Sequence, residues 1–340
     1  MRRVENPPNR FEPLVREWLE EPPQARVEVF EEDTRSILSG NTSPDLPFRW
    51  SVNPYRGCFH ACAYCYARPT HEYLGFGAGT DFDTKIVVKP RAPELLRAAF
   101  LQPAWSGELI VFSGNTDCYQ PLEATWKLTR RCLEVCAEFR NPVGVITKAL
   151  LVQRDLDVLQ ELRRHAAVTV FLSIPFADDA TGRAIEPQAP LVSRRFEALR
   201  NLAQAGIPTG VSIAPLIPGL NDEDMPRILA RARDCGARYA QRVLLRLPGS
   251  VRTVFLERLR QVLPERAARV ERRIREVRGG KLNESGFFAR QRGHGVYWDL
   301  LERQWKLHRR RLGFESLRNG DAPAGPATFR RPSPAQGRLF

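Results

Sequence analysis

The chain of 340 residues contains no apolar run as long as the ~18–20 positions that a membrane-spanning helix needs. Its first residues, MRRVENPPNRFEP, are basic but include no apolar stretch, so the sequence predicts no cleaved secretory signal. Internal repeats of fixed period are also missing. We therefore expect a cytoplasmic protein without a membrane partner.

Cysteine is present in an odd number and lacks the spacing of a disulfide framework. Three of the seven cysteines fall within eight residues. A small secreted scaffold is therefore excluded, and free thiols that serve metal binding or catalysis are expected. Hydrophobic residues make up 43% of the chain, which is enough to bury a full core and excludes disorder over most of it.

Positive charge is concentrated at one end of the chain. Residues 1–250 carry 31 Lys and Arg against 30 Asp and Glu, whereas residues 251–340 carry 21 against 9, a net charge of +12. A basic module after a near-neutral body is typical of a polyanion-binding segment. A solvated basic helix face is the alternative, because arginine outnumbers lysine by 46 to 6, as a GC-rich genome would favour.

Short apolar segments alternate with amphipathic ones from Phe48 onward. Such segments are typical of parallel strands covered by helices on both faces. We therefore predict an α/β fold, a partial (β/α)6 barrel with its chemistry at the carboxyl ends of the strands. The expected strands are Trp50–Tyr55, Glu108–Ser113, Pro142–Thr147, Val168–Ile174, Pro208–Ala214 and Tyr239–Leu247, and the expected helices are 91–101, 122–140, 154–164, 191–205 and 222–236.

The predicted organisation has four regions. Residues 1–47 form an N-terminal extension that wraps the body, and residues 48–250 form the barrel core. Residues 251–314 form a basic helical C-terminal segment, with helices over 251–278 and 294–313. Residues 315–340, rich in Pro, Ala, Gly and Arg, form a disordered tail.

Three cysteines, Cys58, Cys62 and Cys65, lie in one loop after the first expected strand. Thiolates are the ligands that iron–sulfur clusters require, and three of them can bind three corners of a cuboidal cluster. The fourth iron then stays open, which is typical of a catalytic metal site rather than a structural one. A zinc site is the alternative, with His60, His71 or Cys118 as a further ligand.

This CxxxCxxC loop, with the aromatic Tyr64 before its third cysteine, resembles the signature of the radical SAM superfamily. The resemblance implies a [4Fe-4S] cluster held by Cys58, Cys62 and Cys65, with S-adenosylmethionine (SAM) on the open iron. It also implies an electron donor such as flavodoxin or ferredoxin. Reduction of the cluster would cleave SAM to methionine and a 5′-deoxyadenosyl radical.

Further stretches are similar to the branch of this superfamily that contains spore photoproduct lyase and the bacterial proteins named DNA repair photolyases. The similarity runs over about residues 35–313 and implies a nucleic acid or nucleotide as substrate. The stretches are Asn53–Cys58, Cys65–Gly75, Lys85–Pro90, Leu128–Val135, Ile146–Lys148, Ala214–Asp222 and Arg278–Leu282.

Polar residues follow the second, third and fourth expected strands. By resemblance, Thr116 and Asp117 help to bind SAM, Lys148 pairs with its carboxylate, and Ser173 meets its ribose or carboxylate. A zwitterionic ligand with a ribose requires a cation, an acceptor and hydroxyl groups. These four residues and Tyr64 are therefore predicted to bind the cofactor, with ordinary loop capping as the alternative.

One position departs from this branch. Where the lyase has a cysteine that returns a hydrogen atom to the repaired base, this chain has Gly114. Cys118 lies four residues further on and is a candidate hydrogen donor, with a partly buried thiol of no function as the alternative. The resemblance therefore does not extend to the lyase's own reaction.

Arg246 ends the sixth expected strand, where it would bind a substrate carboxylate or phosphate, or pair with a helix. Further along, Trp298 and Trp305 lie among basic residues, an arrangement that suits a nucleic-acid groove. The tryptophans also fit the inner face of a docked helix. The basic residues are Arg303, Lys306, His308, Arg309, Arg310 and Arg311.

These patterns predict a radical SAM enzyme that acts on a nucleic acid or nucleotide, which the basic C-terminal segment helps to bind. Radical modification of a protein or peptide is the alternative reaction. A metal-stabilised nucleic-acid-binding module without catalysis is the alternative from another class.

Overall fold

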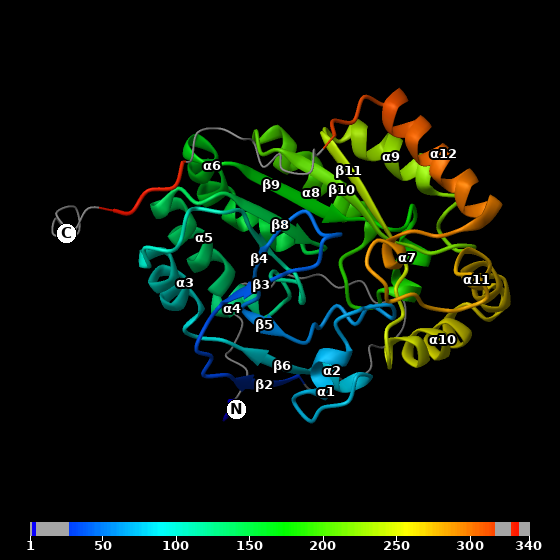
Figure 1. Ribbon diagram of the computed structural model, residues 1–340, viewed down its shortest axis with the longest axis horizontal. Coiled ribbons are helices and arrows are strands. Elements are labelled where there is room, and N and C mark those ends of the chain that lie inside the picture. The colour runs from blue at the N-terminus through cyan, green and yellow to red at the C-terminus, as the bar shows by residue number, and fades with distance from the viewer. Residues whose placement is uncertain (1, 5–26, 317–327, 333–340) are drawn as a thin grey trace.

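A curved sheet of seven strands forms the centre of the fold (Figure 1). The computed structural model describes residues 2–4, 27–316 and 328–332. Six of the strands run parallel and lie side by side in chain order, which confirms the predicted partial (β/α)6 barrel. They are β4 (Trp50–Val52), β7 (Ile110–Phe112), β8 (Val143–Thr147), β9 (Val168–Ser173), β10 (Thr209–Leu216) and β11 (Tyr239–Leu244).

The strand predicted over Trp50–Tyr55 is in fact two strands in different sheets. Pro54 lacks the N–H that would continue the ladder of β4. Beyond it, β5 (Tyr55–Arg56) turns into a second, four-stranded sheet with the order β1-β2-β6-β5. Its other strands are β1 (Arg2–Val4), β2 (Glu28–Glu31) and β6 (Lys85–Val88), and the short helices α1 (Pro69–Glu72) and α2 (Thr80–Thr84) lie between β5 and β6.

The N-terminal extension predicted over residues 1–47 contributes strands to both sheets. Its described part holds β1, β2 and β3 (Leu38–Gly40), and β3 pairs antiparallel with β4 at the edge of the main sheet. The sequence analysis expected no strand here, because these strands are short and have no regular apolar alternation.

Helices follow the parallel strands and cover the outer face of the main sheet (Figure 1). Their apolar faces pack on strands such as β7, in which all three residues are buried. The helices are α3 (Ala92–Leu101), α4 (Glu123–Trp126), α5 (Leu128–Phe139), α6 (Leu156–His165) after the 3-10 turn Leu150–Asp155, α8 (Val192–Gln204) and α9 (Met225–Asp234). An additional helix, α7 (Asp179–Ile185), begins where Asp178 accepts a hydrogen bond from the backbone N–H of Thr181.

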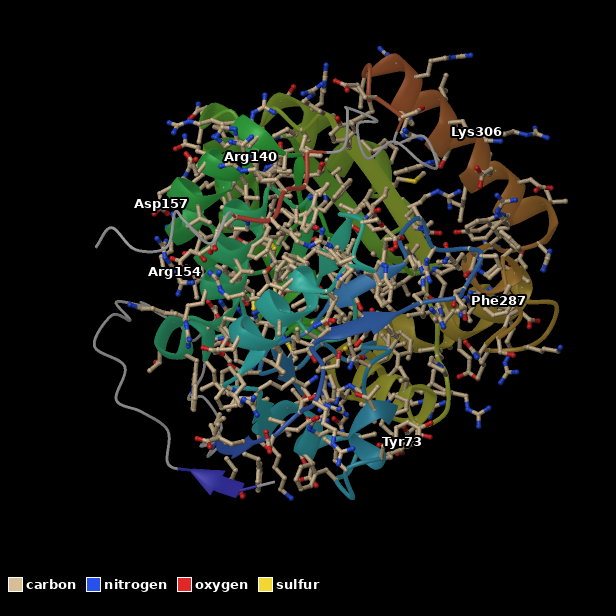
Figure 2. All side chains as sticks on the ribbon, turned by 60° about the vertical axis from the view of Figure 1, so that its left-hand side comes forward. Tyr73, Arg140, Arg154, Asp157, Phe287 and Lys306 are labelled. Atoms are coloured by element: carbon tan, nitrogen blue, oxygen red, sulfur yellow. The ribbon has the colours of Figure 1, made fainter. Side chains whose placement is uncertain are left out.

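The basic C-terminal segment forms three helices beside β11. The single helix predicted over 251–278 is divided into α10 (Val251–Val262) and α11 (Pro264–Val277), because the residue before a proline disfavours the helical conformation. A 3-10 turn (Ala289–Gln291) and α12 (Gly295–Arg311) follow, and Lys306 projects from α12 into solvent (Figure 2).

The two tryptophans of α12 are packing residues. Trp298 and Trp305 are both buried, and the guanidinium of Arg242 on β11 lies 4.6 and 5.3 Å from their rings. Arg242 also pairs with Glu302 of the same helix. Neither indole is therefore available to stack on a base.

The tail predicted to be disordered, 315–340, falls largely outside the described residues. Its described stretch 328–332 lies on the fold, with the ring of Phe329 at 5.9 Å from that of Phe100 and 6.0 Å from that of Phe139. These aromatic contacts hold this piece against α3 and α5.

No helix in the described ranges has the length and apolar content that a bilayer crossing requires.

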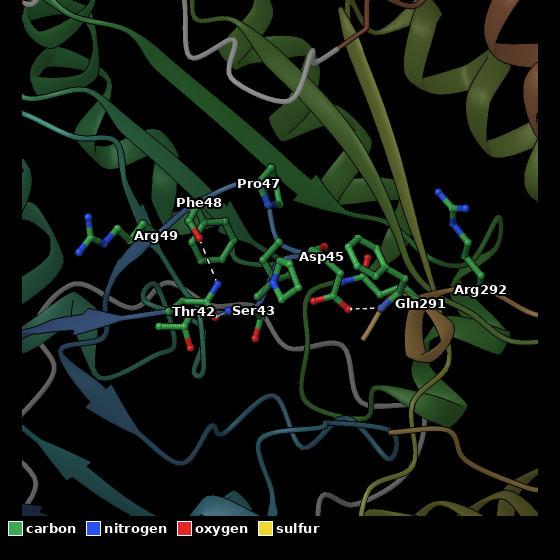
Figure 3. Close-up of a pocket in the computed structure, with 12 residues that line it drawn as sticks. Thr42, Ser43, Asp45, Pro47, Phe48, Arg49, Gln291 and Arg292 are labelled. Carbon is green, nitrogen blue, oxygen red and sulfur yellow. Dashed lines mark hydrogen bonds between the residues drawn. The ribbon is translucent and has the colours of Figure 1, made fainter. Parts of the chain in front are cut away.

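The main sheet does not close into a barrel, and its edge strands are β3 and β11. The loop between β3 and β4 is hydrogen-bonded to the loop between α11 and α12. Asp45, from the loop between β3 and β4, accepts hydrogen bonds from Arg290 Nε at 2.6 Å and from the backbone N–H of Phe288 at 3.0 Å. Gln291 Nε2 donates to the carbonyl of Asp45 at 3.0 Å. We call these four residues the edge clasp; a hollow of about 640 Å³ lies beside it, lined by residues 41–49 and by Phe288, Gln291 and Arg292 (Figure 3).

Candidate active site

The loop that carries Cys58, Cys62 and Cys65 leaves β5 at a glycine. Gly57 has a φ of +75°, and a Cβ at this position would lie 2.8 Å from His71 Cε1, so a larger residue does not fit. His71 itself shares a hydrogen bond with the carbonyl of Lys85 at 2.8 Å, which makes it a structural residue. The loop is thus shaped by local backbone constraints.

Arg68, which is fully buried, supports this loop from inside. Its guanidinium donates to the carbonyl of Cys62 at 2.8 Å, to the carbonyls of Ala78 and Gly79, and to the Asp83 carboxylate at 2.8 Å. From α10, Arg258 donates to the carbonyl of Ala61 at 2.9 Å and to Asp83 at 2.5 Å. The cysteine loop therefore depends on the C-terminal segment for part of its support.

Burial favours the protonated form of all three thiols. Their thiolates are therefore expected only when a bound metal neutralises the negative charge. Burial raises the pKa of the Cys62 thiol to about 12, against the opposing effect of Lys148. Burial also raises the pKa values of Cys58 and Cys65, and the proximity of the other two cysteines adds to this in Cys58. Iron would therefore have to displace protons from all three, as metal binding to cysteine generally does.

The donor set fits a cluster better than a single ion. Within the described ranges, no three His, Cys, Asp or Glu side chains come close enough to hold one metal ion. A mononuclear zinc site needs four ligands around one point, whereas each thiolate of a cuboidal cluster binds a different iron. The zinc alternative through His60, His71 or Cys118 thus lacks support.

Asp117 organises the rim beside the cysteine loop. Its carboxylate accepts hydrogen bonds from Thr147 Oγ1 at 2.6 Å and from the backbone N–H groups of Lys148 at 2.8 Å and Tyr119 at 3.0 Å. His60 Nδ1 lies 3.4 Å away. Burial opposes ionisation, but these hydrogen bonds and His60 outweigh it and hold the pKa of Asp117 below its usual range. With four partners the carboxylate is saturated.

Lys148, Tyr64 and Glu186 form a second polar group at this rim. The ammonium of Lys148 lies 5.6 Å from the centre of the Tyr64 ring and 3.9 Å from Glu186 Oε1. The Tyr64 hydroxyl donates to Glu186, which is fully buried and pairs with Arg195 at 2.5 Å. Within the described residues, the nearest carboxylate pairing of Lys148 is thus this distant one, and its charge is available to a ligand.

The other predicted cofactor residues lie at the same edge of the sheet. Thr116 follows β7, and its hydroxyl oxygen is buried without a hydrogen-bond partner in the described structure. Ser173 ends β9, where its register partner on β10 is Ser212. Both side-chain amide atoms of Gln120 are also buried and unpartnered within the described residues. Such groups cost free energy unless a ligand or water satisfies them, which fits a rim that holds a polar cofactor.

Cys118 lies behind this rim rather than on its surface. It is 1% exposed, its backbone N–H donates to Ser113 Oγ at 2.8 Å, and burial raises the pKa of its thiol well above the usual range. Cys132 and Cys136 belong to the same apolar core. The role of Cys118 as a hydrogen donor stays a prediction. Its side chain is almost fully buried in the structure.

The sequence analysis missed the residues that hold the site from a distance. Glu186 ends α7, Arg195 lies on α8, and Arg258 lies on α10, so each is far along the chain from the cysteines. No spacing signal links them to the loop, because their proximity depends on the packing of helices. Asp178 is of a residue type that favours helix starts, which is a local signal for α7 that could have been used.

Comparisons with known proteins agree with this geometry. The model of the Radical SAM superfamily matches residues 52–232. An uncharacterized protein of Mycobacterium bovis is 37% identical over 226 residues, which cover 66% of this chain and 66% of the relative. The Nα-GlyT isomerase of Pseudomonas phage M6, named as a radical SAM protein, is 23% identical over 51% of this chain and 34% of its own length.

Solved structures show the same fold. Spore photoproduct lyase complexed with dinucleoside spore photoproduct superimposes with a TM-score of 0.61 at 15% sequence identity. The superposition covers 84% of this chain and 80% of the lyase. The predicted similarity to this branch is therefore confirmed for the fold.

Proposed function

Since this chain belongs to the radical SAM superfamily of enzymes, we propose that Cys58, Cys62 and Cys65 hold a [4Fe-4S] cluster and that SAM binds beside it. The observation that carries the proposal is the loop of two buried thiols, Cys58 and Cys62, and the half-buried Cys65, next to Lys148 and Asp117. When bound, the cluster would supply the electron for reductive cleavage of SAM. A flavodoxin or ferredoxin would provide that electron, in the cytoplasm.

Each rim residue then has a distinct task. Lys148 offers its ammonium to the carboxylate of SAM, because its own carboxylate neighbour lies 3.9 Å away. The unpartnered hydroxyl of Thr116 and the strand-end Ser173 supply polar contacts to the amino group or ribose. Asp117 is already saturated, so it positions Lys148 and Thr147 rather than contacting SAM. Tyr64 belongs to the cysteine loop, and its ring lies 5.6 Å from the Lys148 ammonium.

Lys148→Ala should weaken SAM binding about tenfold or more, because a hydrogen bond to a charged group is lost. The cluster should stay intact, since the lysine is not one of its ligands. Equilibrium dialysis with SAM and an iron assay on the same sample test both statements. Lys281→Ala is the matched control, because Lys281 is an exposed lysine near Glu284. Equal SAM affinity in the two variants would remove Lys148 from the site.

We place the substrate among nucleic acids or nucleotides. Two observations support this: the fold similarity to an enzyme whose solved complex contains a dinucleoside, and the net charge of +12 over residues 251–340. A radical reaction on a nucleic acid requires the basic segment to lie beside the site, and Arg258 of α10 does contact the cysteine loop.

The wild-type protein should form 5′-deoxyadenosine from SAM and dithionite, and its affinity for DNA or RNA should fall steeply with salt.

Arg310→Gln combined with Arg311→Gln should reduce the salt slope of binding by up to about 2, since each phosphate contact contributes about 0.9. Arg309 is left unchanged because it packs 5.6 Å from Trp305 and donates to the carbonyl of Glu315 at 3.0 Å. The melting temperature should hardly change, since both residues are exposed. An unchanged slope would exclude this end of α12 from binding, and absence of any salt-sensitive affinity would favour a peptide substrate.

A further inference from the structure

The loop between α11 and α12 is attached to the carboxyl end of β11. Arg278, which is buried, donates from its guanidinium to the carbonyls of Leu245, Ala289 and Arg292 at 2.8–2.9 Å. Asn283 Oδ1 accepts a hydrogen bond from the backbone N–H of Leu247 at 2.9 Å. The loop is therefore fixed beside Arg246, the residue that the sequence placed at the barrel mouth.

Among the described residues, Arg246 has no carboxylate within ion-pair distance. It forms no ion pair among the described residues, and its buried Nε has no hydrogen-bond partner there. Burial and the nearby Arg290 both lower its pKa. The Asp45 carboxylate opposes this lowering, but it is itself engaged by Arg290 in the edge clasp. The helix ion pair considered for Arg246 is thus absent from the described structure, and the guanidinium lies 5.8 Å from the ring of Tyr66, the residue after Cys65.

Two adjacent aromatic side chains are exposed on the same loop. Phe287 and Phe288 are 55% and 54% exposed, and Figure 2 shows Phe287 at the outer surface beside the C-terminal helices. Phe288 has a φ of +62°, a strained conformation for a residue with a bulky side chain, and Asp45 holds its N–H at 3.0 Å. The guanidinium of Arg290 lies 5.0 Å from the Phe287 ring. Strain held in place by several contacts is typical of binding sites.

We infer that Arg246, Phe287 and Phe288 form a binding site for a phosphate group with its adjoining base. The inference rests on the proposed function and assigns its substrate contact to this loop rather than to the tryptophans of α12. Arg246 binds the phosphate, since a guanidinium matches its geometry. The two phenylalanines stack on bases, and Phe288 also lines the hollow of about 640 Å³ beside the edge clasp. Stacking of this kind requires unpaired bases, so the ligand is a nucleotide or a single strand.

Binding of a fluorescein-labelled oligodeoxythymidylate to the full-length, anaerobically purified protein tests this site. Phe287→Ser combined with Phe288→Ser should weaken binding about tenfold, because base–aromatic stacking is lost. The salt slope should stay unchanged in that variant. Arg246→Gln should reduce the salt slope by about one unit.

Two matched variants serve as controls. Val296→Ser combined with Leu300→Ser removes exposed apolar surface from α12, and Arg140→Gln removes a charge at the end of α5, which Figure 2 places on the opposite side from Phe287. Both should bind the oligonucleotide as the wild type does. If the Phe287/Phe288 and Arg246 variants also bind as the wild type does, the inference is wrong.

Competition with dTMP distinguishes the two ligands that could carry the phosphate, a free nucleotide and a single strand. Displacement by dTMP at concentrations similar to those of unlabelled oligonucleotide supports a free nucleotide, and displacement by the oligonucleotide alone supports a single strand. Tighter binding of duplex DNA than of single strands overturns the inference. The wild type's formation of 5′-deoxyadenosine without nucleic acid is measured separately, so failure of the proposed function and failure of this site give different results.

Discussion

Replacing Cys58, Cys62 or Cys65 by Ala should abolish both the brown colour of the anaerobically purified protein and its cleavage of SAM. Each thiolate is expected to bind a separate iron, so the loss of any one thiolate removes a ligand that the cluster needs. Iron and sulfide content, visible absorption and 5′-deoxyadenosine formation are the measurements. A full iron and sulfide complement in any one of the three variants would contradict the assignment.

Cys136→Ala is the matched control for these variants. Cys136 is buried, as Cys58 and Cys62 are, but it lies in α5 within the apolar core. Its loss removes a small packing side chain and no ligand, so the iron content and the colour should match those of the wild type. Loss of the cluster in this control would indicate that core packing, rather than ligation, determines cluster content.

Arg68→Ala should destabilise the protein by about 3 kcal/mol, the lower end of the cost of removing one partner of a buried ion pair, because Asp83 keeps Arg258 as a partner. The fully buried guanidinium satisfies three backbone carbonyls as well as Asp83, and all of them would lose a donor. Urea unfolding of the cluster-free protein measures this effect independently of activity. Iron incorporation should fall as well, since the carbonyl of Cys62 is among the groups held.

Arg194→Ala provides the comparison for Arg68. Arg194 pairs with Glu197 on α8, and both side chains are exposed. Exposed pairs contribute about 0–1 kcal/mol, so this variant should unfold close to the wild type. A similar urea midpoint for the two variants would show that Arg68 does not support the loop. Arg68→Lys should rescue little, because an ammonium cannot donate in so many directions at once.

The parallel strands could be predicted because most of them are short apolar runs; β11, with mostly half-buried residues, is the exception. Val168–Ser173, for example, was expected over Val168–Ile174, and its burial explains the pattern. The second sheet could not be predicted, since β5 has two residues and pairs with β6 far along the chain. Short strands with such distant partners have no periodic signal of their own.

The candidate site was predictable where its residues are local and not where they meet through packing. Cys58, Cys62 and Cys65 share one loop, so their spacing was informative. Lys148 and Asp117 were placed by resemblance, and the hydrogen bond between the Lys148 N–H and the Asp117 carboxylate brings them to one rim. The buried Glu186–Arg195 pair could not be foreseen, because only the position of α7 against α8 creates it.

The contacts of Arg258 show that the stretch recognised by the family model is not a complete physical unit. Residues 52–232 contain the cysteines but exclude β11, β3 and α10. A fragment cut at those limits would leave one edge of the sheet unpaired at β10 and would remove the donor that Arg258 gives to Ala61 and Asp83. The stretch that the family shares and the set of contacts that holds the cysteine loop therefore have different boundaries, and Arg258 of the basic segment lies only within the second.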